Sequence, residues 1–197
     1  MMDLMKQGKL FISNELTIDT TLIFLQQFKY LVSQSHKNIY IYINSFGGNA
    51  DCANAIIDEF NEAIKNNINI ITIVQGCAFS SAAFILANGK YRFATPNSSI
   101  MLHSILYELP YDYHKYAKKY TDFADRFGKK ILESLAIRCG YTTHMKKAQF
   151  ITMIEDSVWL TPIEAKNLNI IDDIWSYNVE KRKRKNSVLS SKIRKTN

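Results

Sequence analysis

Several ingredients of common protein classes are scarce or missing in this chain of 197 residues. It has only three cysteines, widely spaced and odd in number, which indicates a reducing compartment and no disulfide framework. No apolar run approaches the roughly 20 residues that span a bilayer. The first residues also lack the apolar core of a signal peptide. We therefore expect a soluble protein of the cytoplasm, or of the stroma or matrix if an organelle encodes it.

Motifs of metal-dependent and esterase chemistry are missing as well. The chain contains no H-E-x-x-H or C-x-x-C pattern, and its four histidines show no metal-ligand spacing. The sequence therefore predicts no metal site and no cofactor. The esterase elbow G-x-S-x-G is also absent, because Gly76 lies four residues before Ser80. This spacing argues against an α/β-hydrolase.

The composition indicates one globular domain. A hydrophobic fraction of 47% with 12% aromatic residues is ordinary for a folded chain of this length. Residues 180–197 hold eight Lys and Arg and one Glu, so they account for the whole net charge of +7. We predict a single domain over residues 1–179 and a basic, disordered tail over residues 180–197. Nucleic-acid binding is a minor alternative for the tail, since the neutral body has no matching basic patch.

Apolar spacing predicts strands that alternate with helices. The run at 68–74 is almost wholly apolar and β-branched, which is typical of a strand buried on both faces of a parallel sheet. The sequence T-P-I-E at 161–164 is a capping box with proline at the first helical position, so a late helix begins there. The alternation predicts an α/β fold with a mostly parallel sheet. Expected strands are 10–12, 39–43, 68–74, 91–94, 99–103 and 170–174, and expected helices 19–33, 53–64, 80–88 and 111–138.

Residues 75–103 carry a candidate serine nucleophile. A strand pattern ends near Gly76, Ser80 starts a small-residue helix, and His103 ends a later strand. Serine is a weak nucleophile at neutral pH and needs a base such as histidine within hydrogen-bond reach. Taken alone, Ser80 could equally be a helix N-cap, and His103 could equally be a histidine of the core. Cys77 is interpreted as a small buried residue at a strand end.

The glycine pair Gly47-Gly48 stands between a predicted strand and a predicted helix. Glycine allows a sharp turn and a close approach of bare N–H groups to a ligand. Such groups can form an oxyanion hole, in which one donor is worth about 10²–10³ in rate. An ordinary turn is the alternative, and the pair alone does not decide between them.

Three motifs in order combine these features: I-N-S-F-G-G at 43–48, G-C-A-F-S-S-A-A at 76–83 and P-N-S-S-I-M-L-H at 96–103. Together they resemble the Clp endopeptidase proteolytic subunit, with similarity from about Leu10 to Ile174. The resemblance implies the spiral fold of repeated ββα units that this family shares with the crotonases. It also implies Ser80 as nucleophile, His103 as general base, and an oxyanion hole formed by the N–H groups of Gly48 and Ser81.

The resemblance also implies an aspartate as the third catalytic residue. The family places it just before a short aromatic strand and an S/T-x-x-E-A helix, represented here by residues 158–165. A gap-free match puts Ser157 at this position and Asp156 one residue earlier, and a one-residue slip in extended chain reverses the side-chain face. We expect a local bulge to let Asp156 complete the triad, because a buried imidazolium needs an anion. A Ser–His dyad with weak help from Asp156 is the alternative.

The function implied is that of an ATP-dependent-type serine endopeptidase subunit. It would cleave unfolded polypeptides through an acyl-enzyme, within a homo- or hetero-oligomeric ring served by an AAA+ unfoldase. Phe46 replaces the family's usual proline and Phe79 a small residue, so both are expected to reshape the substrate pocket. The chain before Leu10 is short for axial loops, and 104–113 lacks a glycine-rich handle strand, which indicates a single ring or altered assembly. The alternatives are an inactive ring subunit and a crotonase-type acyl-CoA enzyme, and a phage-type prohead protease is a variant of the leading hypothesis.

Overall fold

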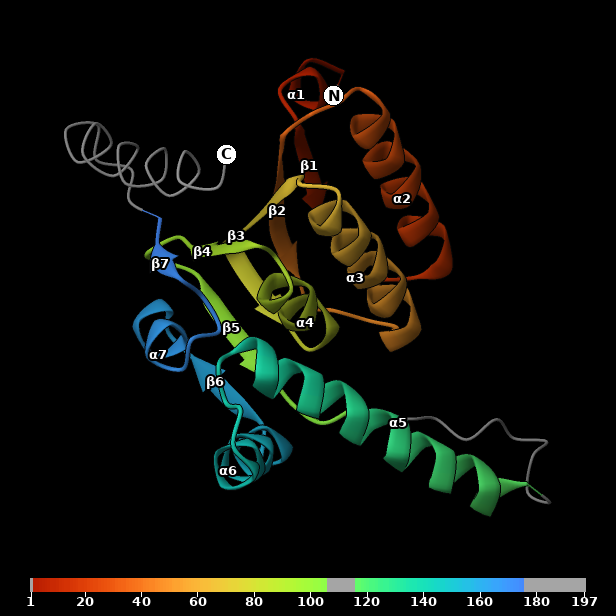
Figure 1. Ribbon diagram of the computed structural model, residues 1–197, viewed down its shortest axis with the longest axis vertical. Helices are drawn as coiled ribbons and strands as arrows, with labels where there is room; N and C mark the ends of the chain where they lie inside the picture. Colours follow the sequence, from red (N-terminus) through yellow and green to blue (C-terminus); the bar gives the residue numbers. More distant parts are fainter. Residues whose placement is uncertain (1, 106–115, 176–197) are drawn as a thin grey trace.

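A mostly parallel β-sheet forms the centre of the computed structural model, which describes residues 2–105 and 116–175 (Figure 1). One path of strands runs β1-β2-β3-β4-β7, and every neighbouring pair in it is parallel. The predicted α/β class is therefore confirmed. The strands are β1 (Lys9–Ile12), β2 (Asn38–Ser45), β3 (Asn69–Phe79), β4 (Tyr91–Ala94), β5 (Ser99–Leu102), β6 (Val158–Leu160) and β7 (Asp173–Ile174).

The long strand β3 has different neighbours along its length. Residues 71–74 pair with β4, whereas residues 77–79 pair with β5. Strand β6 then pairs with β5 in antiparallel orientation. The sheet thus divides near Gly76, and the second half of β3 leads into Ser80.

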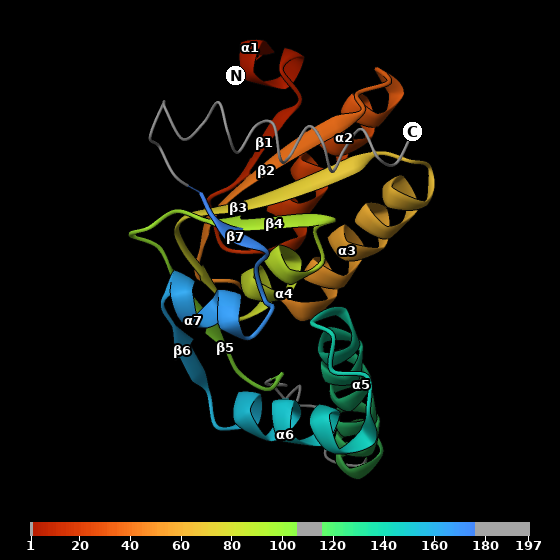
Figure 2. The same ribbon diagram turned by 60° about the vertical axis from the view of Figure 1, so that its left-hand side comes forward.

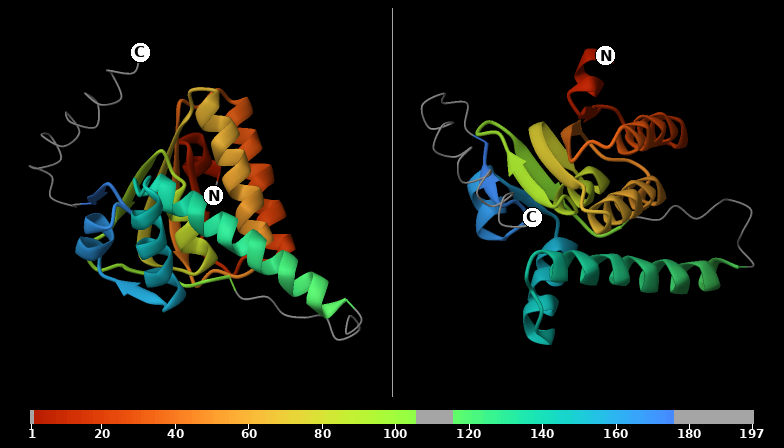
Figure 3. Two further views of the ribbon diagram at one scale, coloured as in Figure 1. Left: turned by 60° about the horizontal axis from the view of Figure 1, so that its bottom comes forward. Right: turned by 45° about the horizontal axis from the view of Figure 1, so that its top comes forward.

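Three helices cover one face of the sheet: α2 (Ile18–Ser33), α3 (Ala50–Lys65) and α4 (Ser81–Ala87) (Figure 3). Helix α2 begins at a Thr17 capping box, and α3 begins where the Asn49 side chain accepts the N–H groups of Asp51 and Cys52. Their apolar faces meet in the core, where the fully buried rings of Phe28 and Phe60 lie 5.4 Å apart. This packing fixes the start of α3, which follows the glycine pair.

The remaining helices are α1 (Met2–Lys6), α5 (Ala117–Arg138), α6 (His144–Glu155) and α7 (Pro162–Asn167). The C-terminal end of α5 lies against α4, and its first turns point away from the sheet (Figures 2 and 3). Among the described helices, none is both long and apolar enough to cross a membrane.

Most predicted elements are confirmed with small changes in their ends, and two predictions need correction. The strand expected at 68–74 continues to Phe79, because its second half gains β5 as a neighbour. The strand expected at 170–174 is reduced to Asp173–Ile174. Here Asn169 adopts a left-handed turn (φ 55°), and Ile170 donates back to Ala165, closing α7 instead of joining the sheet.

Some predictions fall outside the described residues, and two observed helices were not predicted. Residues 111–115 of the predicted helix 111–138, the boundary at 179 and the basic tail all lie outside the described ranges. Helices α1 and α6 were not predicted. Helix α6 buries only Phe150 and Ile154, too few apolar positions for a periodic pattern to stand out.

Candidate active site

Ser80 occupies a strained turn between β3 and α4. Its backbone angles, φ 52° and ψ −128°, are sparsely populated by residues other than glycine. The turn is held because the Ser80 N–H donates to the Met101 carbonyl (2.8 Å) and the Ser80 carbonyl accepts from the Ala83 N–H (2.9 Å). The Ser80 side chain makes no capping hydrogen bond. The N-cap alternative for this serine is therefore wrong, and its hydroxyl is available for other chemistry.

The glycine pair is required by close backbone contacts. Gly47 and Gly48 have φ of 97° and 139°, where side chains are strained. A Cβ on Gly47 would lie 2.6 Å from the Phe79 carbonyl oxygen, and one on Gly48 would lie 2.6 Å from that of Leu16. This segment therefore packs directly between the chain at Leu16 and the turn at Ser80.

The Gly48 peptide groups face the start of α4. On the opposite side, the Gly47 carbonyl accepts from Leu16, and the Asn49 N–H donates to Leu16. Because N–H and C=O directions alternate along extended chain, the Gly48 N–H and C=O point away from Leu16. The Ser81 hydroxyl donates to that Gly48 carbonyl at 3.0 Å. At the first position of α4, the Ser81 N–H has no acceptor within the helix. Two backbone donors are thus brought beside Ser80.

His103 follows β5 and lies half-buried beside the same turn. A cleft of about 590 Å³ is lined by four of the five predicted site residues: Gly48, Ser80, Ser81 and His103. Nδ1 of His103 contacts the Ser104 carbonyl oxygen. An Nδ1–H that donates there leaves Nε2 as the proton acceptor, which is the tautomer a general base needs. Within the described residues, no hydrogen bond joins Ser80 to His103.

Asp156 is the one predicted site residue that does not line this cleft. It forms the exposed C-cap of α6, with its N–H donating to the Thr152 carbonyl. The extended chain expected here is wrong, because Ser157 adopts a left-handed turn (φ 64°) before β6 begins. In the β5–β6 pairing Leu102 faces Val158, so the segment at 156–157 approaches His103. The only hydrogen bond of the His103 ring within the described residues is nevertheless with Ser104.

Other groups line the cleft that the sequence did not point to. Helix α5 contributes Tyr120 and Ile131, and two acidic side chains, Glu15 and Asp51, also belong to the lining. No local motif marks these positions. Helix α5 is brought to the cleft only by its packing in the folded chain.

The aromatic residues Phe46 and Phe79 do not line the cleft, and their expected effect on the substrate pocket stays a prediction. They form a row with Trp159, with ring centroids 5.5 Å apart between Phe46 and Phe79 and 5.0 Å apart between Phe79 and Trp159. Phe46 and Trp159 are mostly exposed. The row lies on the register line that joins Phe79, Met101 and Trp159 across three strands.

Among the described residues, the cleft lining contains no cysteine and no cluster of metal ligands. Cys77 lies within β3 and is half-buried rather than buried, with its N–H donating to Asn44 Oδ1. Burial raises the pKa of the Cys77 thiol, which disfavours the nucleophilic thiolate. In the ranges 2–105 and 116–175, no three His, Cys, Asp or Glu side chains are grouped to hold a metal ion.

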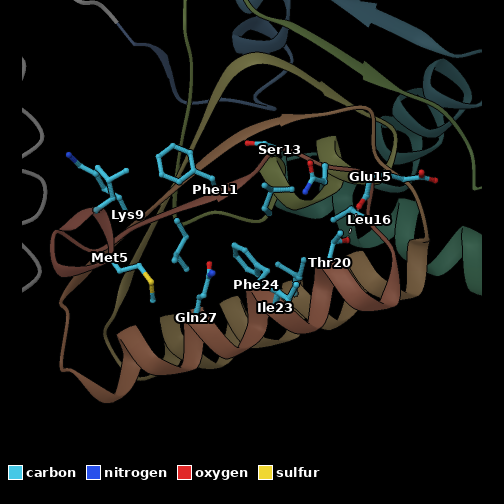
Figure 4. Close-up of a pocket in the computed structure, with 15 residues that line it drawn as sticks. Met5, Lys9, Phe11, Ser13, Glu15, Leu16, Thr20, Ile23, Phe24 and Gln27 are labelled. Carbon is cyan, nitrogen blue, oxygen red and sulfur yellow. Dashed lines mark hydrogen bonds between the residues drawn. The ribbon is translucent and has the colours of Figure 1, made fainter. Parts of the chain in front are cut away.

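A second hollow of about 270 Å³ lies between β1 and α2 (Figure 4). Its lining is mainly apolar, including Phe11, Ile23 and Phe24, with Glu15 at one end. None of the predicted catalytic residues reaches it. We therefore place the candidate active site in the cleft at Ser80.

Comparisons with known proteins agree on one family. A family model described as Clp protease matches residues 1–178. A proteolytic subunit 3 of an ATP-dependent Clp protease from Streptomyces avermitilis is 35% identical over 150 residues, covering 73% of this chain and 63% of the relative. An ATP-dependent Clp protease proteolytic subunit from Ligilactobacillus salivarius is 39% identical over 106 residues, covering 52% of each protein. The matched segments thus span less than two thirds of either relative's length.

Proposed function

The chain belongs to the Clp protease family, and on that premise we propose that it is a serine endopeptidase subunit. Its substrates are unfolded polypeptides, whose peptide bonds it hydrolyses through an acyl-enzyme. The observation that carries the proposal is the strained, uncapped Ser80 in a cleft shared with His103, Gly48 and Ser81.

The catalytic steps divide among four residues. The Ser80 hydroxyl attacks the peptide carbonyl carbon while His103 Nε2 accepts its proton. The N–H groups of Gly48 and Ser81 donate to the oxygen that becomes negative. His103 then gives the proton to the leaving amine. A water molecule then attacks the acyl carbonyl carbon while His103 accepts its proton, and His103 passes this proton to the Ser80 oxygen as the product with the new carboxyl group leaves.

Asp156 remains in the proposal as the residue that orients His103. Its support is the β5–β6 pairing, which puts the end of α6 close to the segment after Leu102. The Ser104 carbonyl contact on Nδ1 favours a second arrangement, a Ser–His dyad oriented by the backbone. The exposed position of Asp156 and the lack of a Ser80–His103 hydrogen bond within the described residues favour, as a second candidate function, a ring subunit that keeps the fold without cleaving peptides.

We also propose an assembly for this subunit. The names of both relatives describe ATP-dependent proteolytic subunits, which supports an oligomeric ring that works with an AAA+ unfoldase. The domain at 1–179 forms the ring, and the basic tail at 180–197 follows it. The proposed location is the cytoplasm, or the stroma or matrix of an organelle.

A fluorophosphonate probe tests the catalytic proposal directly. It should label the native protein and fail to label Ser80→Ala, while Ser33→Ala, a change at an exposed serine of α2, should be labelled normally. Equal labelling of the native protein and Ser80→Ala would contradict the assignment. A folded protein that neither reacts with the probe nor cleaves peptides, even with an activating ATPase, would favour the non-catalytic subunit.

A further inference from the structure

Helix α4 carries the candidate nucleophile at one end and has an unusual arrangement at the other. It is only seven residues long, Ser81–Ala87, and Ser80 immediately precedes it. The last carbonyls of any helix lack donor partners within the helix and must be satisfied by other groups. The groups that do so here therefore determine where the helix ends and how firmly it is held.

Arg138, the last residue of α5, bonds the last carbonyl of α4 and the two carbonyls that follow it. Its Nε donates to the Ala87 carbonyl (3.4 Å), and its Nη2 donates to the carbonyls of Asn88 (3.1 Å) and Gly89 (2.6 Å). An arginine is suited to this because its planar fork presents several donors in fixed directions. Its positive charge also lies at the negative end of the α4 dipole.

A side chain of the sheet also bonds this end of α4. The buried Thr72 hydroxyl, on β3, donates to the Leu86 carbonyl at 2.8 Å. Gly89 lies so close to Thr72 that a Cβ there would be 2.3 Å from its Oγ1. Arg138 and Thr72 thus tie the end of α4 to α5 and to β3.

Within the described ranges, Arg138 forms no ion pair. The nearby carboxylate of Asp172 pairs with Arg92 at 2.7 Å. The three hydrogen bonds from Arg138 all go to backbone carbonyls at the end of α4. Its guanidinium therefore acts on the position of α4.

Backbone strain at Ser80 makes this hold relevant to catalysis. A strained conformation persists only where the surrounding structure over-determines it. The start of α4 is fixed by the Ser80 N–H and the Ser81 hydroxyl, and its far end by Arg138 and Thr72. Because α4 has only seven residues, we expect release of its far end to displace Ser80 and the Ser81 N–H relative to Gly48 and His103.

We propose that Arg138 is a positioning residue of the active site, which couples the placement of α5 to the reactivity of Ser80. This inference rests on the proposed serine peptidase function. The same helix α5 lines the cleft with Tyr120 and Ile131, so a shift of α5 reaches the site by two routes. A contact made on the projecting part of α5 would therefore change the rate of acylation as well as the shape of the cleft (Figure 3).

The test compares Arg138→Met, Arg138→Lys, Thr72→Val and a matched control, Arg126→Met, which makes the same change at an exposed arginine of α5. The full-length protein is treated with a fluorophosphonate probe, and the limiting rate of labelling and the half-saturating concentration are measured well below each melting temperature. Arg138→Met should lower the limiting rate by about tenfold or more with little change in half-saturation, since small misplacements can cost on the order of 10²-fold. Arg138→Lys should recover part of the rate, and Arg126→Met should match the native protein.

The outcomes separate this inference from the proposed function. If the native protein is not labelled at Ser80, the proposed function fails. If it is labelled and Arg138→Met reacts at the native rate, with or without a lower melting temperature, Arg138 is merely structural and the inference is overturned. If Arg138→Met does not fold, Arg138→Lys and Thr72→Val test the inference instead. Limiting rates within about twofold of the native rate overturn the inference. Slower limiting rates at the native half-saturating concentration support it.

Discussion

The Ser81 hydroxyl donates a 3.0 Å hydrogen bond to the carbonyl oxygen of Gly48. This bond joins the first residue of α4 to the glycine segment, which lie 33 positions apart in the chain. Both residues carry a backbone N–H of the proposed oxyanion hole. The side chain of one donor residue thus sets its distance from the other.

Ser81→Ala should weaken catalysis more than binding. Loss of a buried hydrogen bond should lower the free energy of unfolding by about 1 kcal/mol. It should also lower kcat by about tenfold or more with little change in KM, because the two N–H donors lose their fixed spacing. Thermal unfolding and peptide kinetics measure the two effects. Ser98→Ala is the matched control, since this similarly buried serine donates to the Thr95 carbonyl away from the cleft. A similar stability loss with unchanged kcat is expected there, and the same result for Ser81→Ala would contradict the prediction.

Ser80→Gly should be more stable than Ser80→Ala, although both are expected to be inactive. Glycine adopts the backbone angles of this turn without strain, whereas alanine keeps a penalty of about 1–3 kcal/mol. The glycine variant has a more flexible unfolded chain, and this cancels about 0.4–1 kcal/mol of its advantage over the alanine variant. The net expectation is that the glycine variant is more stable by about 1 kcal/mol, measured by chemical denaturation. At Ser33, in the last turn of α2, the order should reverse because alanine favours a helix. The same order at both positions would argue against strain at Ser80.

Gly48→Ala should be far more damaging than an alanine substitution at another glycine with positive φ. Its Cβ would lie 2.6 Å from the Leu16 carbonyl oxygen, so the segment must move. We expect a stability loss of at least about 2 kcal/mol and, in folded protein, a decrease in kcat of about 10²–10³. Gly140→Ala is the control, because Gly140 also has positive φ (87°) but an added Cβ there would meet nothing within 4 Å. It should lose only about 1–2 kcal/mol and keep full activity. An active, stable Gly48→Ala would contradict the predicted clash with Leu16 and the displacement of the residue-48 N–H.

Acidification should remove the contribution of Glu164 to stability. The Thr161 N–H and then the Thr161 hydroxyl bond its carboxylate, which lowers the pKa of Glu164 below the ordinary value of 4.5. A lowered folded-state pKa stabilises the fold above 4.5, and this stabilisation is lost as the pH falls through the lowered value. The native protein should therefore melt above Glu164→Gln near neutral pH, with the gap closing below pH 4.5. Thr161→Val should reduce this pH dependence. A difference in melting temperature that stays constant at acidic pH would contradict the proposed link between the Glu164 carboxylate and stability.

The strands, most of the helices and the chemistry of the site follow from local patterns. A run rich in β-branched and aromatic residues predicted β2, apolar spacing of three and four residues predicted α2 and α3, and the capping box predicted α7 at Thr161. Helix α6 was not predicted because only two of its side chains are buried. The short final strand was overestimated, since Ile170 and Ile171 are buried without joining the sheet. An apolar run predicts that its side chains are buried, but it does not predict which element of the fold covers them.

Sequence alone determined which residues are chemically able to act: a serine at a strand–helix junction, a histidine after the next strand, and a glycine pair. Tertiary structure decided what these residues do to one another. It oriented the Gly48 N–H toward α4, strained Ser80 so that its hydroxyl does not cap the helix, and put Asp156 at an exposed helix end. It also brought Arg138 to the end of α4 from 49 positions away. Hydrogen-bond direction and backbone strain arise from contacts between segments distant in the chain, which no local pattern contains.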